Sequence, residues 1–104
     1  MRMLPTDREP TPPGEMLREE FMKPLGLTQA ELAAKLGMPR VALNAIINGT
    51  RSVTPGTAMR LAKALGTTPE FWINGQTAVD LYRAEHDAEQ MRAVAKITPI
   101  NGAT

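Results

Sequence analysis

Apolar residues recur along the chain at the three- and four-residue spacing of helices that bury one side. The clearest stripe lies between Thr54-Pro55 and Gly66, and its members are Ala58, Leu61, Ala62 and Leu65. Side chains at this spacing share one face of a helix. Threonine followed by proline is a frequent helix start, and glycine is a frequent stop. The pattern predicts a helix from Pro55 to about Leu65.

The same signals place four further helices. Thr28 and Glu31 form a capping box, because each side chain can bond the backbone N–H of the other residue. Thr68-Pro69 repeats the start signal, and Pro24 is expected to stop the first helix. The predicted ranges are 14–23, 28–36, 39–48 and 68 to about 83. No window alternates apolar and polar residues, so the sequence predicts an all-α fold of five helices without a sheet.

The two ends of the chain differ from its middle. Prolines stand among polar residues near the start, and residues 1–11 are interpreted as a flexible arm. Residues 12–83 are the predicted domain, and residues 84–104 are a C-terminal extension. Within this extension, Ala84 to Lys96 either prolongs the fifth helix or adds a short one, and the segment from Ile97 is expected to fray.

The second and third helices are joined only by Gly37 and Met38, which is the spacing of a helix-turn-helix. This motif needs a small residue where its two helices meet and a turn residue that tolerates positive φ. Ala33 and Gly37 meet these needs. The second helix of the pair needs apolar anchors on its buried face, and these are Leu43, Ile46 and Ile47. An ordinary helical hairpin in a small bundle is the alternative.

The charge of the chain is distributed unevenly around a total of +1. Residues 28–66 carry five basic side chains against Glu31 alone, a net charge of +4. Residues 1–27 carry −1 and residues 67–104 carry −2. A basic middle between acidic ends fits a segment that binds a polyanion. Because +4 is modest beside strongly basic nucleic-acid binders, the charge taken alone favours an ordinary solvated surface over a polyanion-binding segment.

Three segments carry a resemblance to a known family. The run TQAELAAKLG, from Thr28 to Gly37, resembles the helix-turn-helix of lambda-repressor-like (XRE-type) regulators. The opening PPGEMLREEF, from Pro12, and the block RLAKALGTTPEFW, from Arg60 to Trp72, are similar to HigA antitoxins. The resemblance extends from about residue 12 to 82. Two positions depart from the family pattern: Gly75 replaces a larger apolar residue, and Pro39 replaces a capping serine.

The resemblance implies a five-helix lambda-repressor-like domain that acts as a dimer. Such a protein represses its own operon at a palindromic operator and neutralises a HigB-type toxin, a ribosome-dependent mRNA endonuclease. Two alternatives remain open at this stage. One is a stand-alone repressor without a toxin, and the other is a helical protein-interaction module that has lost DNA binding.

In a helix-turn-helix the second helix enters the major groove with its N-terminal residues toward the base edges. Arg40 is suited to a bidentate contact with guanine, and Asn44 is suited to adenine. Val41 and Ala45 are suited to a thymine methyl group, with Ala42 nearby. Phosphate contacts are expected from helix ends and from the following loop. The residues concerned are Thr28, Gln29, Asn48, Thr50 and Arg51.

Dimer contacts are expected on the fifth helix, whose aromatic and apolar surface is large for a lone C-terminal helix. The candidates are Phe71, Val79 and Tyr82. For Val79 and Tyr82, packing in the core of the protomer is an equal alternative. Trp72 is assigned to that core.

Several classes of function find no support in the sequence. Cysteine is absent, which removes disulfides, thiolate metal sites and cysteine nucleophiles. His86, the sole histidine, lies in a polar run and is interpreted as a surface residue. No phosphate loop, nucleophile elbow or metal-ligand spacing appears, so neither an enzyme nor a cofactor is expected. No apolar run approaches membrane-spanning length, and a cytoplasmic location is expected.

Overall fold

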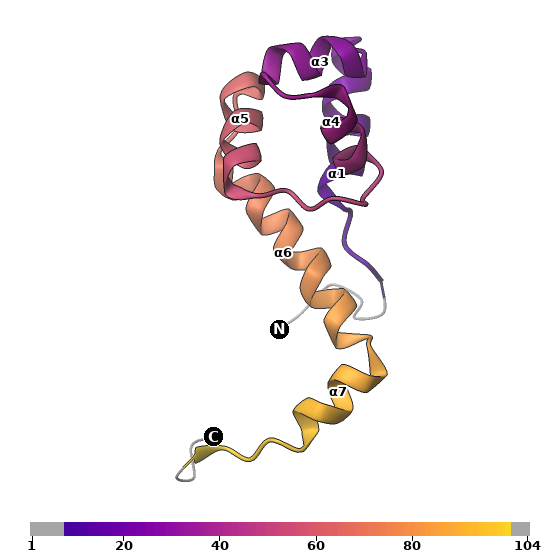
Figure 1. The fold of residues 1–104 in the computed structure, drawn as a ribbon, viewed down its shortest axis with the longest axis vertical. Coiled ribbons are helices and arrows are strands. Elements are labelled where there is room, and N and C mark those ends of the chain that lie inside the picture. The colour runs from indigo at the N-terminus through magenta and orange to yellow at the C-terminus, as the bar shows by residue number, and fades with distance from the viewer. Residues whose placement is uncertain (1–7, 101–104) are drawn as a thin grey trace.

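A computed structural model describes residues 8–100, and every regular element in this range is helical. Figure 1 shows a head of short helices from which one long helix descends. The elements are α1 (Pro13–Met16), η1 (Leu17–Met22), α2 (Lys23–Leu25), α3 (Gln29–Leu36), α4 (Arg40–Ile47), α5 (Pro55–Leu65), α6 (Pro69–Glu85) and α7 (Ala88–Ala95). All five predicted helices are present, so the all-α fold class is confirmed.

The first helix continues past Pro24, which corrects its predicted end. The elements α1, η1 and α2 follow one another without a break from Pro13 to Leu25. The middle part is π-helical, and the N–H of Lys23 donates to the carbonyl of Arg18, five residues back. Proline normally clashes with the carbonyl four residues before it, and the wider π turn relieves this clash. The helix ends instead at Gly26, which has φ 66°.

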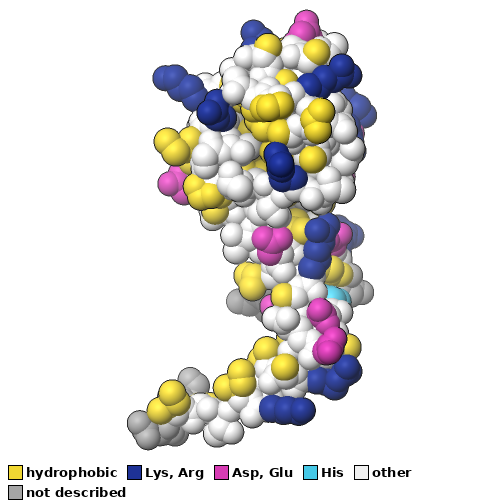
Figure 2. All heavy atoms as spheres, in the orientation of Figure 1, with side chains coloured by type: hydrophobic (Ala, Val, Ile, Leu, Met, Phe, Trp, Pro, Cys, Tyr) yellow, Lys and Arg dark blue, Asp and Glu magenta, His cyan; other side chains and the backbone are white. Residues whose placement is uncertain are grey.

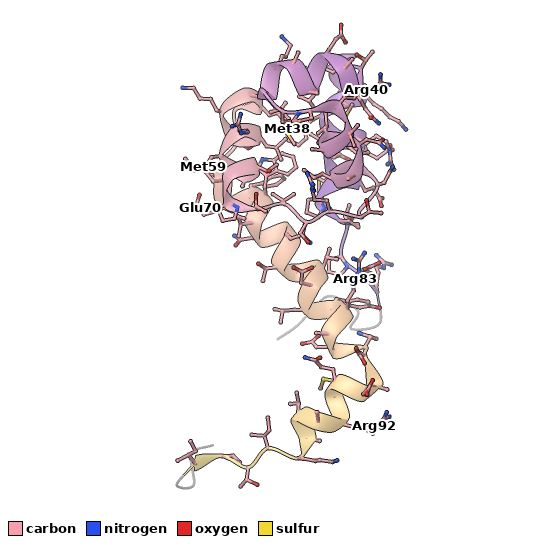
Figure 3. All side chains as sticks on the ribbon, viewed as in Figure 1. Met38, Arg40, Met59, Glu70, Arg83 and Arg92 are labelled. Carbon is pink, nitrogen blue, oxygen red and sulfur yellow. The ribbon has the colours of Figure 1, made fainter. Side chains whose placement is uncertain are left out.

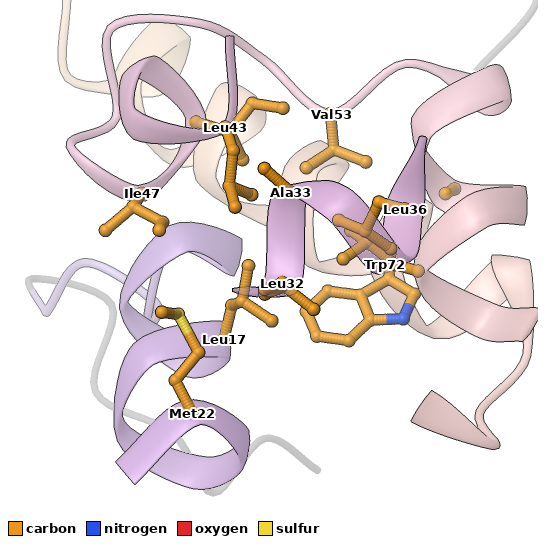
Figure 4. Packing of buried hydrophobic residues seen from close by; sticks show 12 residues of the cluster. Leu17, Met22, Leu32, Ala33, Leu36, Leu43, Ile47, Val53 and Trp72 are labelled. Atoms are coloured by element: carbon orange, nitrogen blue, oxygen red, sulfur yellow. The ribbon is translucent and has the colours of Figure 1, made fainter. Parts of the chain in front are cut away.

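The core lies where the helices of the head meet around one tryptophan. Figure 4 shows the side chains of Leu17, Leu32 and Leu36 gathered near the indole of Trp72. Trp72 is 1% exposed, and its indole N–H donates to the Thr67 hydroxyl at 2.7 Å. The assignment of Trp72 to the core of the protomer is confirmed.

Gly14 brings the first helix into direct contact with the backbone of α4. A Cβ atom at this position would lie 2.2 Å from the carbonyl oxygen of Ile46 and 2.6 Å from that of Ile47. Such distances are far inside van der Waals contact, so only glycine fits without moving one of the two helices. This contact fixes the C-terminal end of α4 against α1.

The C-terminal part of the molecule leaves the head. We call residues 12–79 the head, and residues 80–100, which comprise the end of α6, α7 and the segment after it, the stem. The radius of gyration is 17.0 Å, whereas a compact domain of this length has about 13 Å. Every residue of α7 is exposed, and Figure 1 shows this helix apart from the head.

The structure answers part of what the sequence left open about the ends. Helix α6 runs through the expected boundary at residue 83 and ends at Glu85, and α7 is a separate short helix capped by Asp87. Of the expected arm and tail, residues 1–7 and 101–104 lie outside the described residues. Within the described part of the arm, Glu9 pairs with Arg83 at 2.6 Å.

Candidate nucleic-acid interface

The capping box at the start of α3 forms as predicted. The Thr28 hydroxyl accepts from the N–H of Glu31 at 3.1 Å, and the Glu31 carboxylate accepts from the N–H of Thr28 at 2.8 Å. The hydrogen bond from the Thr28 N–H is the main reason that the pKa of Glu31 lies below its ordinary value. This end of α3 presents Gln29 as its first helical residue, beside the free N–H groups of the first turn.

The turn between α3 and α4 has the geometry that a helix-turn-helix needs. Gly37 has φ 67°, its N–H donates to Ala34, and the N–H of Met38 donates to Ala33. This pair of bonds is the Schellman arrangement that closes a helix. Ala33 is 4% exposed where α3 meets its neighbours. The predicted roles of Ala33 and Gly37 are confirmed.

Sequence reasoning missed a residue that braces this turn. Arg60, on α5, donates from one guanidinium nitrogen to the carbonyls of Leu36 and Gly37 at 2.7 and 3.2 Å. These carbonyls belong to the helix end and the turn, which attract positive charge. Because the contact joins residues 23 and 24 positions apart, no local pattern indicates it.

Helix α4 has one buried and one exposed side. The predicted anchors Leu43, Ile46 and Ile47 are buried. Val41 and Asn44 are exposed on the other side, and Arg40 is exposed as the first residue of the helix, at the edge of the head in Figure 3. Val41 is 82% exposed, more than any other large hydrophobic residue of the described range.

The remaining predicted contact residues gather around α4. Ala42 and Ala45 are half-buried along its flanks, and Asn48, Thr50 and Arg51 are exposed in the loop that follows. The Thr50 hydroxyl donates to the carbonyl of Ala45 at 3.2 Å, which holds this loop against the helix end. The arrangement leaves the N-terminal half of α4 and the adjoining loop open to a ligand.

The predicted dimer contacts separate into different environments. Val79 is 1% exposed and packs inside the protomer, so it is unable to contact a partner and that prediction is wrong. Phe71 is 42% exposed and makes edge-to-face contacts with Phe21 and Trp72. Tyr82 is half-buried and stacks on His86, with ring centroids 4.0 Å apart.

The stem exposes apolar residues that sequence reasoning did not select. They are Leu81, Met91, Val94, Ile97 and Ile100, exposed by 40% to 78%. Figure 2 shows apolar side chains along one edge of the lower part of the stem. The sequence does contain a signal for this surface, because Met91 and Val94 are three residues apart, on one face of a helix capped by Asp87.

Within residues 8–100, no group of acidic or histidine side chains is arranged to hold a metal ion. None of the helices in that range combines the length and apolarity that a membrane-spanning helix needs.

Residues 19–72 match the helix-turn-helix family. The antitoxin HigA-1 of Vibrio cholerae is 48% identical over 80 residues, which cover 77% of this chain and 75% of that protein. The chain belongs to the HigA-type antitoxins of the XRE helix-turn-helix family.

Solved structures of antitoxin and antidote proteins have the same fold as this chain. A HigA-family antidote protein from Coxiella burnetii has a TM-score of 0.80 and 41% identity, covering 88% of this chain and 99% of that one. The antitoxin GraA, solved in complex with its operator, has a TM-score of 0.81 and 39% identity, covering 94% and 98%. This HigA-type chain therefore falls among helix-turn-helix regulators rather than enzymes, as the sequence predicted.

Proposed function

We propose that this HigA-type antitoxin binds its own operator by inserting the N-terminal half of α4 into the major groove. The observation that carries the proposal is the two-sidedness of α4. Three buried anchors fix the helix, a Val and an Asn are exposed on its free side, and an Arg is exposed at its N-terminal end. An apolar side chain as exposed as Val41 gains contact area only against a ligand, and the thymine methyl group suits it. The similarity to the antitoxin GraA, solved in complex with its operator, supports operator binding by this chain.

We further infer that the chain acts as a homodimer joined through the stem. An isolated helix of eight residues is marginal in water, and α7 has no buried residue of its own. A second stem packed against Met91 and Val94 would bury their apolar side chains and stabilise the helix. Two heads related by a two-fold axis would then read two half-sites of a palindrome.

Operator binding is tested by titrating the DNA upstream of the gene with wild-type protein and with Arg40→Ala. The variant is expected to bind about 1–3 kcal/mol more weakly, because it loses a bidentate base contact. Lys63→Ala on α5 is the control, since it removes an exposed charge away from α4. Equal affinity of wild type and Arg40→Ala would exclude Arg40 from base reading. Affinity for an unrelated duplex equal to that for the upstream DNA would overturn the proposal.

The second part of the proposal is that this chain binds a toxin. The name of the Vibrio cholerae relative, antitoxin HigA-1, supports a HigB-type toxin, encoded beside this chain, as its partner. In the cytoplasm this chain would neutralise the toxin and repress the operon. Co-expression with the neighbouring gene product tests this. A stable complex in size-exclusion chromatography and relief of growth arrest are expected. Operator binding without either result would favour a stand-alone repressor.

A further inference from the structure

Arg83 lies where the stem meets the loop that follows α4. An open cleft of about 280 Å³ is lined there by Pro12, Glu15, Arg18, Asn48, Gly49 and Arg83, among others. A smaller adjoining cleft shares Gly49 and Arg83 and adds Arg51. Figure 3 shows Arg83 on α6, just below the head. Folding thus brings a guanidinium from residue 83 to the loop whose residues are expected to contact phosphate.

The guanidinium of Arg83 is held by a carboxylate in the free protein. Its Nε donates to Glu9 Oε2 at 2.6 Å, and the two side chains are 53% and 39% exposed. An ion pair this exposed contributes at most about 1 kcal/mol, because water and salt screen it. The pair therefore opens at low cost when a stronger anion approaches.

We propose that Arg83 binds a backbone phosphate of the operator and that Glu9 competes with this phosphate for the guanidinium. The inference rests on the proposed DNA-binding function. A phosphate offers arginine the same pair of charge-assisted hydrogen bonds as a carboxylate, and duplex DNA presents it with a high charge density. Arg18 in the larger cleft and Arg51 in the smaller one add positive charge, while Glu15 in the larger cleft opposes it and Glu19 pairs with Arg18 at 2.9 Å. The segment before α1 thus weakens binding to DNA until Glu9 is displaced.

The test measures operator affinity from about 50 to 200 mM salt for wild type, Arg83→Gln, Glu9→Gln and the double variant. Arg83→Gln is expected to bind about tenfold more weakly on every sequence, with a salt slope smaller by about 1. Glu9→Gln is expected to bind about threefold more tightly at low salt, and this gain should shrink as salt screens the competing carboxylate. The double variant should match Arg83→Gln, because Glu9 acts only through Arg83.

Controls separate phosphate binding from changes in folding and net charge. Arg92→Gln and Glu89→Gln, exposed on α7, make the same charge changes outside both clefts and should leave affinity unchanged. Size-exclusion chromatography and thermal unfolding check that each variant keeps its oligomeric state and fold. If Arg83→Gln is misfolded, Arg83→Lys, which keeps the positive charge, should retain most of the salt slope, and Glu9→Gln remains interpretable.

The inference and the proposed function fail in different ways. If wild-type protein binds its operator specifically but Arg83→Gln has the same affinity and slope, only the role of Arg83 is overturned. If Glu9→Gln binds no more tightly than wild type, the competition is overturned and the pair merely ties the N-terminal segment to α6. Wild-type protein without specific binding would overturn both.

Discussion

The head and the stem differ in where their apolar side chains lie. In the head, residues such as Leu17, Leu32 and Leu43 are completely buried around Trp72. In the stem, Leu81, Met91 and Ile97 remain open to water although two helices run through it. Burial stabilises the helices of the head at about 25 cal/mol for each Å² of apolar surface removed from water. The stem has little such burial within one protomer.

This difference assigns the two regions different tasks. The head is self-sufficient, so it holds α4 in a fixed orientation before DNA arrives. The stem exposes apolar side chains that a second protomer would cover in the proposed dimer. The proposed binding to a palindrome needs both preorganised contact residues and a dimer, and it assigns the first to the head and the second to the stem.

If the stem joins two protomers, charged residues in its apolar stripe should separate them without unfolding the head. We expect the double variant Met91→Lys with Val94→Lys to be monomeric and to bind the operator about 100-fold more weakly, because the avidity of paired half-sites is lost. The thermal midpoint of the head should stay unchanged. Size-exclusion chromatography with light scattering and a DNA titration measure both effects.

The matched control is Glu89→Gln with Ala93→Lys. It raises the net charge of α7 by the same two units at positions on the side of the helix opposite Met91 and Val94. This control should remain dimeric and keep its affinity. A dimer formed equally well by both double variants would place the interface elsewhere, with the exposed part of Phe71 as the next candidate.

The head is expected to tolerate no added atom at Gly14. Gly14→Ala should destabilise the protein by about 3 kcal/mol, because the new methyl group would overlap the carbonyl oxygens of Ile46 and Ile47. Gly56→Ala is the control, since a Cβ there meets no atom within 4 Å, and it should be neutral or stabilising by up to about 1 kcal/mol. Urea unfolding measures both. Equal stability of the two variants would contradict the close approach of α1 to α4.

The brace on the helix-turn-helix is a smaller contribution to the head. Arg60→Ala should cost about 1–2 kcal/mol of unfolding free energy, because the carbonyls of Leu36 and Gly37 lose a charged donor. Lys63→Ala, one turn later on the same helix, should change stability by less than about 0.5 kcal/mol. Hydrogen exchange should locate the loosening at the end of α3. If the backbone amides at the end of α3 exchange as slowly in Arg60→Ala as in wild type, the turn does not depend on this contact.

Local signals in the sequence were sufficient for the helices and the turn. The capping box at Thr28, the stop at Gly37 and the apolar stripe of α5 each depend on residues within a few positions of one another. The exposed side of α4 followed from the same periodicity. These features were predictable because short-range backbone geometry determines them.

Contacts between distant segments were beyond such reasoning. Arg60 reaches the turn across 23 residues, and Glu9 meets Arg83 across 74. Val79 was assigned to a dimer contact because periodicity places apolar residues on a face without showing what covers that face. The end of the first helix was misplaced at Pro24 because the π turn before it has no recognised sequence signal.

The last and smallest expected effect concerns acid. Hydrogen bonds from Thr28 lower the pKa of Glu31, and hydrogen bonds from Lys23 and Arg18 lower that of Glu19, from an ordinary value of 4.5. A carboxylate whose pKa is lower in the folded state binds fewer protons there than in the unfolded chain, so it stabilises the fold above its ordinary pKa. This stabilisation is lost as the pH falls below 4.5 and through the lowered folded pKa.

Urea midpoints measured from pH 7 to pH 3 should therefore fall more steeply for wild type than for Glu31→Gln, whose amide keeps the capping geometry without titrating. Glu20→Gln, an exposed change on η1, serves as the control and should follow wild type. Parallel curves for all three proteins would show that the capping box of the head contributes nothing through its charge.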